Sequence, residues 1–150
     1  MLSRFLTADN IQFRQSVPDW QTAIRAAAEP LVLSGTATNE YVESMVASVQ
    51  THGPYIVVDD GLALPHARPE DGARRPGMSM LILAKPVDLL GNRVTVLIAL
   101  AATDATSHLT ALQELAELVW NGGTAEKLAS FTDPAAVAAY IQSHTKEAEA

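Results

Sequence analysis

The chain has 150 residues, of which 48% are hydrophobic and 18% are charged. This composition predicts one globular domain over residues 1–150 and excludes a chain that is disordered throughout. The formal net charge of −7 argues against nucleic acid as a partner, because phosphate backbones are bound mainly through Lys and Arg.

The sequence also argues against cysteine chemistry and against a signal peptide or a membrane span. It contains no cysteine, so it has no disulfides and no cysteine nucleophile. Residues 1–15 reach polar side chains too early for the core of a signal peptide, and no segment approaches the ~20 apolar residues of a membrane span. We therefore expect a cytoplasmic protein.

The first part of the chain predicts a strand followed by two helices. Residues 11–15 alternate apolar and polar side chains like a half-buried strand, and helical spacing predicts a helix from residue 19 to residue 31. We expect Pro30 to bend or end that helix early. Residues 39–50 predict a second helix, capped by Asn39 and ended by the Gly-Pro pair that follows.

The middle of the chain predicts strands. Short apolar segments at residues 55–58 and 62–64 flank a tight turn at residues 59–61. Residues 78–84 and 93–100 are continuously apolar, as expected of central strands covered on both faces, and residues 86–92 are expected to connect them.

The last part predicts two helices, at residues 107–120 and 133–144. The first places one apolar stripe along its length, made of Leu109, Leu112, Leu115, Ala116 and Val119. The interleaved pattern predicts an α/β fold, with a single mixed sheet of about four or five strands flanked by helices.

Two of the four histidines are candidates for a functional site. His66 follows a predicted strand end, and His108 lies in the first turn of the helix after strand 93–100. Open α/β sheets place their sites at the carboxyl ends of strands, so the two imidazoles could face one cleft. His52, beside a Gly-Pro turn, and His144, near the end of the chain, favour solvated surface positions.

These residues suit phosphoryl transfer. The helix N-terminus from Asp104 to Ser107 favours an anion and a neutral His108, which can donate one hydrogen bond. His66 is nucleophilic near neutral pH, and Arg68 lies on the same side if the chain stays extended. Such transfer is mostly positioning and charge neutralisation and requires no metal. From spacing alone, structural histidines and a solvated arginine remain an equal alternative.

The segment GPYIVVDDGLALPHARPEDG, residues 53–72, resembles the active-site segment of the EIIA proteins of the bacterial sugar phosphotransferase system (PTS). It is similar to the mannitol/fructose type, whose motif is roughly G-(I/V)-A-(I/V)-P-H. The continuation at residues 67–70 resembles the ascorbate-specific branch. The resemblance extends to the helices that contain Trp20, Tyr41 and His108, and so covers nearly the whole chain.

The resemblance implies the EIIA type-2 fold and a phosphotransferase role in sugar uptake, with ascorbate as the inferred sugar. His66 would accept a phosphoryl group on its tele nitrogen, Nε2, from phosphohistidine of the carrier protein HPr. It would pass that group to a cysteine of an EIIB partner, and the membrane component EIIC would take part only indirectly. His108 matches the supporting histidine. Apart from the resemblance, the helix N-terminus makes Ser107 a candidate phosphate-binding residue. No cofactor is implied, and a homodimer is compatible with the family.

One departure from the family pattern concerns an arginine. Mannitol-type members carry an arginine near the end of the helix before the motif, where this sequence has Gln50 and no nearby arginine. We expect Arg68 to substitute, because it is the cation nearest to His66 in sequence.

Three other functions stay open. A regulatory EIIA of the nitrogen type would keep His66 but bind a target without an EIIB. A metalloenzyme would use both histidines with Asp59 or Asp60, although no close metal-binding motif such as H-E-x-x-H is present. In an inert binding domain both histidines would be structural.

Overall fold

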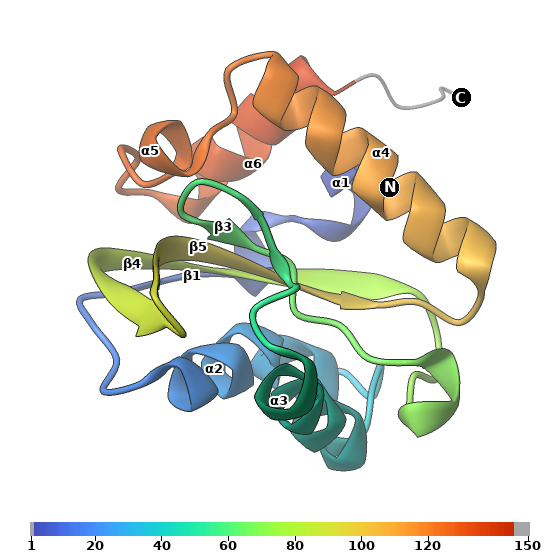
Figure 1. Cartoon of the computed structure of the whole chain (residues 1–150). Coiled ribbons are helices and arrows are strands. Elements are labelled where there is room, and N and C mark those ends of the chain that lie inside the picture. Colours follow the sequence, from blue (N-terminus) through green and yellow to red (C-terminus); the bar gives the residue numbers. More distant parts are fainter. Residues whose placement is uncertain (1, 146–150) are drawn as a thin grey trace.

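The computed structural model describes residues 2–145 and has one sheet with helices on both faces (Figure 1). Its helices and strands, in chain order, are α1 (Leu2–Phe5), β1 (Ile11–Arg14), α2 (Trp20–Leu33), α3 (Asn39–His52), β2 (Val57–Asp59), β3 (Leu62–Ala63), β4 (Gly77–Leu89), β5 (Asn92–Ala101), α4 (Ala105–Trp120), α5 (Ala125–Leu128) and α6 (Pro134–His144). Two short 3-10 turns, η1 (Ala8–Asn10) and η2 (Pro69–Asp71), complete the described part. The predicted α/β fold is confirmed.

The sheet is mixed, with strand order β1-β4-β5-β3-β2. Strand β1 is parallel to β4, and β3 is parallel to β5, whereas the β4–β5 and β2–β3 pairs are antiparallel. Helices α2 and α3 cover one face, and α1, α4, α5 and α6 cover the other (Figure 1). Because successive side chains of a strand point to opposite faces, β4 and β5 supply both cores. Their continuous apolar sequences follow from this double burial.

Pro30 does not end α2, which continues to Leu33, so the predicted early end is wrong. A proline inside a helix leaves the carbonyl four residues earlier without its N–H donor. Here that carbonyl belongs to Ala26, and Gln12 Nε2 on β1 donates to it at 2.9 Å. A side chain from the sheet thus supplies the hydrogen bond that Pro30 cannot make.

The β4–β5 hairpin is longer than predicted. Strand β4 runs through Pro86, and the connection is a two-residue turn at Leu90 and Gly91, both with positive φ. The pairing register shifts between Ile82 and Val87, and such an irregularity accommodates a proline without loss of the strand. The predicted connection over residues 86–92 is therefore wrong.

Other differences are smaller. The buried face of α4 consists of Ala111, Leu115 and Leu118, so the predicted stripe was rotated and Leu109 is 55% exposed. Helix α3 is capped by Thr38, whose side chain accepts from the N–H of Tyr41, and not by the predicted Asn39. The four-residue helices α1 and α5 were not predicted, because they are too short to show a helical period.

Candidate functional site

His66 lies just beyond the carboxyl end of β3, on a segment fixed by backbone hydrogen bonds. The N–H of Leu64 donates to the carbonyl of Ile56 at 2.8 Å, and the N–H of Leu100 donates to the carbonyl of Pro65 at 2.9 Å. Leu64 and Pro65 are buried, and His66 is half-buried. These backbone bonds therefore fix the position of the His66 imidazole at the surface.

The His66 ring is oriented by its own backbone. Its Nδ1 lies 2.7 Å from the carbonyl oxygen of Leu64. Because a carbonyl oxygen can only accept, Nδ1 carries the proton, and in the neutral ring the lone pair is on Nε2. Burial lowers the pKa of His66, the Leu64 carbonyl opposes that effect, and nearby His108 adds to it.

His108 reaches the same place from the neighbouring strand. Strand β5 is parallel to β3, so both strands end at one edge of the sheet, and α4 begins directly after β5. The ring centroids of His66 and His108 are 4.8 Å apart, with an interplanar angle of 59°. The expectation that both imidazoles face one cleft is met.

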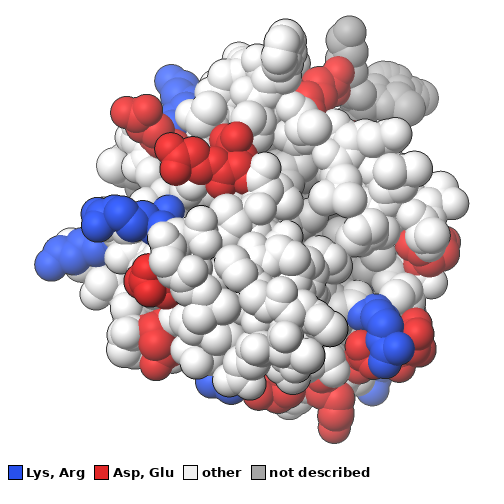
Figure 2. Space-filling view, viewed as in Figure 1, with Lys and Arg blue, Asp and Glu red and all other residues white. Residues whose placement is uncertain are grey.

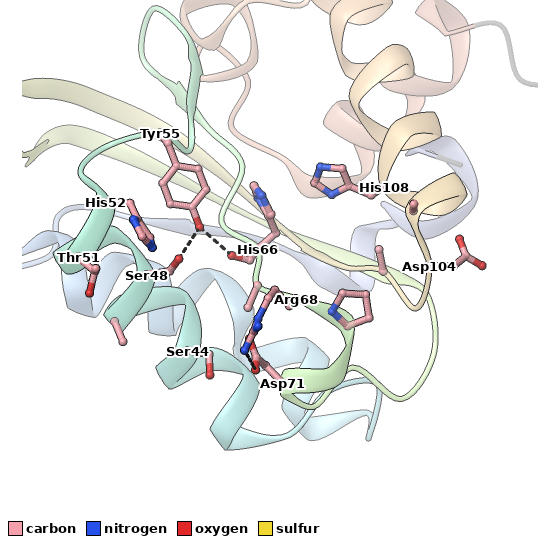
Figure 3. Close-up of a pocket in the computed structure, with 15 residues that line it drawn as sticks. Ser44, Ser48, Thr51, His52, Tyr55, His66, Arg68, Asp71, Asp104 and His108 are labelled. Carbon is pink, nitrogen blue, oxygen red and sulfur yellow. Dashed lines mark hydrogen bonds and ion pairs between the residues drawn. The ribbon is translucent and has the colours of Figure 1, made fainter.

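The two histidines share a pocket of about 790 Å³ between α3 and the start of α4 (Figure 3). Helix α3 contributes Ser48, Thr51 and His52, and Tyr55 follows it. The Oη of Tyr55 donates to Ser48 Oγ at 3.0 Å, and its ring meets the His66 ring edge-on at 5.5 Å. The sequence analysis did not identify this side of the pocket, although Ser44, Ser48 and Thr51 recur along α3 at helical spacing.

Gln50, the residue found in place of the family arginine, does not line the pocket. His52 does, and it is exposed, as its interpretation as a surface residue predicts. His144 is half-buried instead, because its ring stacks on Tyr140 with 4.0 Å between centroids.

Arg68 lines the pocket but is engaged by carboxylates. Its guanidinium lies 3.3 Å from Asp71 and 3.8 Å from Glu70, and its side chain is 74% exposed. These contacts, with the hydrogen bond to Asp71 first, raise the pKa of Arg68. Figure 3 shows the side chain directed toward Asp71 and away from the two imidazoles.

The N-terminus of α4 already holds an anionic group. The carboxylate of Asp104 accepts from the N–H of Ser107 at 2.7 Å, and that contact lowers the pKa of Asp104. Ser107 itself does not line the pocket. The amide of Ser107 is therefore not free to bind a second anion.

The carboxylates considered as metal ligands lie elsewhere. Asp59 lines a separate cavity against the far end of α4, beside Trp120, and neither Asp59 nor Asp60 lines the histidine pocket. Within residues 2–145, no three His, Asp or Glu side chains are grouped closely enough to hold a metal ion.

Among the helices of this described part, none combines the length and the hydrophobicity that a membrane span requires.

Comparisons with known proteins agree on one family. The family model described as "Phosphoenolpyruvate-dependent sugar phosphotransferase system, EIIA 2" matches residues 4–144. The mannitol-specific cryptic phosphotransferase enzyme IIA component of Escherichia coli K12 is 36% identical over 129 residues, which are 85% of this chain and 88% of that protein. The ascorbate-specific PTS EIIA component of the same strain is 33% identical over 102 residues, 66% of each chain.

Solved structures share the fold. The solution structure of the mannitol-specific cryptic enzyme IIA from Escherichia coli has a TM-score of 0.85 and 34% identity, covering 95% of this chain and 98% of that one. Two others show the fold alone. One is enzyme IIA for mannitol from Escherichia coli in complex with phosphorylated IIB, with a TM-score of 0.78 and 23% identity, covering 92% of this chain and 97% of that one. The other is the nitrogen regulatory protein IIA-Ntr of Neisseria meningitidis, with a TM-score of 0.77 and 20% identity, covering 93% of this chain and 98% of that one.

Proposed function

The chain belongs to the EIIA 2 family of the phosphoenolpyruvate-dependent sugar phosphotransferase system, and on that premise we propose that it is a phosphocarrier whose reactive group is Nε2 of His66. One observation carries the assignment to this atom. Nδ1 of His66 is held at the carbonyl of Leu64, so the free nitrogen is Nε2, in a pocket that also holds His108.

The proposed acceptance step is one displacement at phosphorus. The Nε2 lone pair attacks the phosphorus of a phosphohistidine on the donor, for which we propose HPr. A bond forms between Nε2 and phosphorus while the bond between phosphorus and the donor nitrogen breaks, and the donor imidazole leaves with that electron pair. The His66 ring becomes formally cationic, and its Nδ1–H, donated to the Leu64 carbonyl, stabilises the developing charge.

The onward step reverses the role of His66. A cysteine thiolate of an EIIB partner attacks the phosphorus, and the electrons of the bond between Nε2 and phosphorus return to the ring. The absence of cysteine from this chain fits such a division of labour. We also propose the cytoplasm as its location, since donor and acceptor would both meet it there, with the membrane component EIIC reached only through EIIB.

The oxygens of the phosphoryl group need hydrogen-bond donors, but these donors must not bind the group so tightly that it cannot be passed on. His108 is the proposed first donor, because its ring is adjacent to that of His66 and a neutral imidazole can donate one hydrogen bond. Arg68 is the proposed cation, and it must leave Asp71 to act. Ser107 can contribute only through its hydroxyl, because its N–H is already donated to Asp104.

The surface around the pocket offers partners a contact that is largely uncharged. Figure 2 shows that the face over α3 and α4 is mostly uncharged, with Lys, Arg, Asp and Glu gathered toward its edge. Tyr55, whose ring contacts His66, is 43% exposed, and Leu109, which follows His108 in the sequence, is 55% exposed. One such face could serve donor and acceptor in turn, provided that each contact is small and transient.

The identity of the transported sugar is a separate proposal. The pocket handles only a phosphoryl group, so the membrane component would select the sugar. The ascorbate assignment rests on residues 53–70, whereas relatives named for mannitol and for ascorbate both match this chain. We propose ascorbate uptake, to be tested by growth on ascorbate and on mannitol after deletion of the gene.

Incubation with phosphoenolpyruvate, Enzyme I and HPr tests the carrier function. We expect an acid-labile phosphoryl adduct by intact mass, lost in His66→Ala and retained in His144→Ala, which removes a histidine outside the pocket. Addition of the cognate EIIB should then discharge the adduct. A stable adduct that no EIIB discharges would favour the regulatory type of EIIA, and an adduct retained in His66→Ala would refute the assignment.

A further inference from the structure

The hydroxyl of Tyr41 lies where three segments meet: α3, the chain just after His66, and the end of β5. The Tyr41 side chain is fully buried, and no buried side-chain polar atom of residues 2–145 lacks a hydrogen-bond partner. A tyrosine hydroxyl in such a place is costly unless it is bonded. The hydrogen-bond partners of the Tyr41 hydroxyl therefore indicate its role.

Those partners are all backbone groups. The Oη of Tyr41 donates to the carbonyl of Leu100 at 2.8 Å and accepts from the N–H of Ala67 at 3.3 Å. The Ala67 carbonyl is 3.2 Å from the same oxygen, but a hydroxyl has one hydrogen, and the shorter contact to Leu100 takes it. One side chain thus ties the residue after His66 to β5.

Leu100 also holds the residue before His66. Its N–H donates to the carbonyl of Pro65 at 2.9 Å. The backbone N–H and C=O of Leu100 therefore fix both neighbours of His66. The N–H bonds Pro65 directly, and the C=O is linked to Ala67 through the Tyr41 hydroxyl. Without that hydroxyl, only the bond to Pro65 remains of these two links.

We propose that Tyr41 is a positioning residue for phosphoryl transfer: by fixing Ala67 against Leu100 it holds the His66 imidazole so that Nδ1 stays on the Leu64 carbonyl and Nε2 faces the pocket. This inference rests on the proposed function for its effect on rate, but its effect on the ring does not. Burial raises the pKa of Tyr41, so the hydroxyl keeps its proton over the working range of His66.

Tyr41→Phe removes the hydroxyl and keeps the ring that fills the core. In the free variant, 15N NMR of the His66 side chain should show a larger share of the Nε2–H tautomer than in the wild type. The Ala67 amide should exchange its hydrogen at least ~10-fold faster. Transfer from phosphorylated HPr should slow by ~10-fold or more, since a displacement of ~1 Å can cost about 100-fold in rate.

Tyr140→Phe is the matched control, because it deletes a hydroxyl on α6 outside the pocket. It should leave the tautomer, the Ala67 exchange and the transfer rate at their wild-type values. Wild-type values of all three in Tyr41→Phe would overturn the proposal. A tautomer shift in a protein that HPr never phosphorylates would support the positioning role and refute the proposed function instead.

A second measurement needs no variant. If Tyr41→Phe fails to fold, the Ala67 amide of the wild-type chain decides the question. Protected exchange supports the bond to Tyr41, and exchange at the rate of an unprotected amide overturns it.

Discussion

The imidazole rings of His66 and His108 lie with their centroids 4.8 Å apart, although they belong to different segments of the chain. The parallel pairing of β3 with β5 produces this proximity, because both strands end at the same edge of the sheet. At that separation a charge on one ring disfavours a charge on the other. The pair is therefore suited to one neutral nucleophile and one neutral donor.

The first prediction concerns the titration of His66. Burial penalises its imidazolium form, so its pKa, followed by NMR, should lie below the ordinary value of about 6.5. Its contribution to folding stability is then fully present above about pH 6.5 and is lost as the pH falls from there through the folded pKa. His66→Gln should weaken that acid loss of stability. A pKa at or above the ordinary value would contradict the burial argument.

The second prediction concerns His108. His108→Ala should slow phosphoryl transfer to His66 by roughly 100-fold, the usual cost of one lost donor to developing negative charge. His108→Gln keeps an N–H donor and should recover part of the rate. The pKa of His66 should rise slightly in His108→Ala, because the proximity of His108 contributes to lowering it. An unchanged transfer rate in His108→Ala would rule out its role as donor.

The third prediction separates Arg68 from its carboxylate partners. If Arg68 contacts the phosphoryl group, Arg68→Ala should slow transfer about 10-fold, as expected for one lost charge-assisted hydrogen bond. Asp71→Asn removes the nearer of the two carboxylate partners of Arg68 and should slow neither acceptance nor onward transfer. Arg74→Ala, at an exposed arginine that does not line the pocket, is the control. Wild-type rates in Arg68→Ala would show that Arg68 does not replace the family arginine.

The fourth prediction concerns the backbone that positions Arg68. Gly72 has φ +132°, and a Cβ there would lie 2.1 Å from Thr38 Oγ1, the group that caps α3. Gly72→Ala should lower the free energy of unfolding by about 3 kcal/mol, from strain plus the clash. Gly35→Ala is the matched control, since Gly35 has φ +75° with no atom within 4 Å of its Cβ, and it should cost only about 1 kcal/mol. Equal losses in chemical denaturation would contradict the clash.

Much of the fold was predictable because its signals are local. Continuous apolar residues identified β4 and β5, and the Asp-Asp-Gly composition marked the turn between β2 and β3, although Asp59 itself is the last residue of β2. The persistence of α2 through Pro30 was not predictable, because it depends on Gln12 from another element. The turn at Leu90 and Gly91 was missed because Pro86 in β4 suggested that the strand had ended.

The same distinction holds for the site. His66 and His108 could be proposed from their positions after strands, since strand ends of an α/β sheet meet at one edge. The bond from Nδ1 of His66 to Leu64 and the links made by Tyr41 depend on side-chain direction, which no sequence period specifies. The pairing of Arg68 with Asp71 and Glu70 agrees with the alternative in which Arg68 is a solvated charge that balances these nearby carboxylates.

The most direct test of the account identifies the phosphorylated atom. The chain is phosphorylated through Enzyme I and HPr, and the modified imidazole is examined by NMR for coupling between phosphorus and each ring nitrogen. We predict coupling to Nε2 of His66, with Nδ1 still protonated and directed to the Leu64 carbonyl. A phosphoryl group on Nδ1 of His66, or on any other residue, would contradict it.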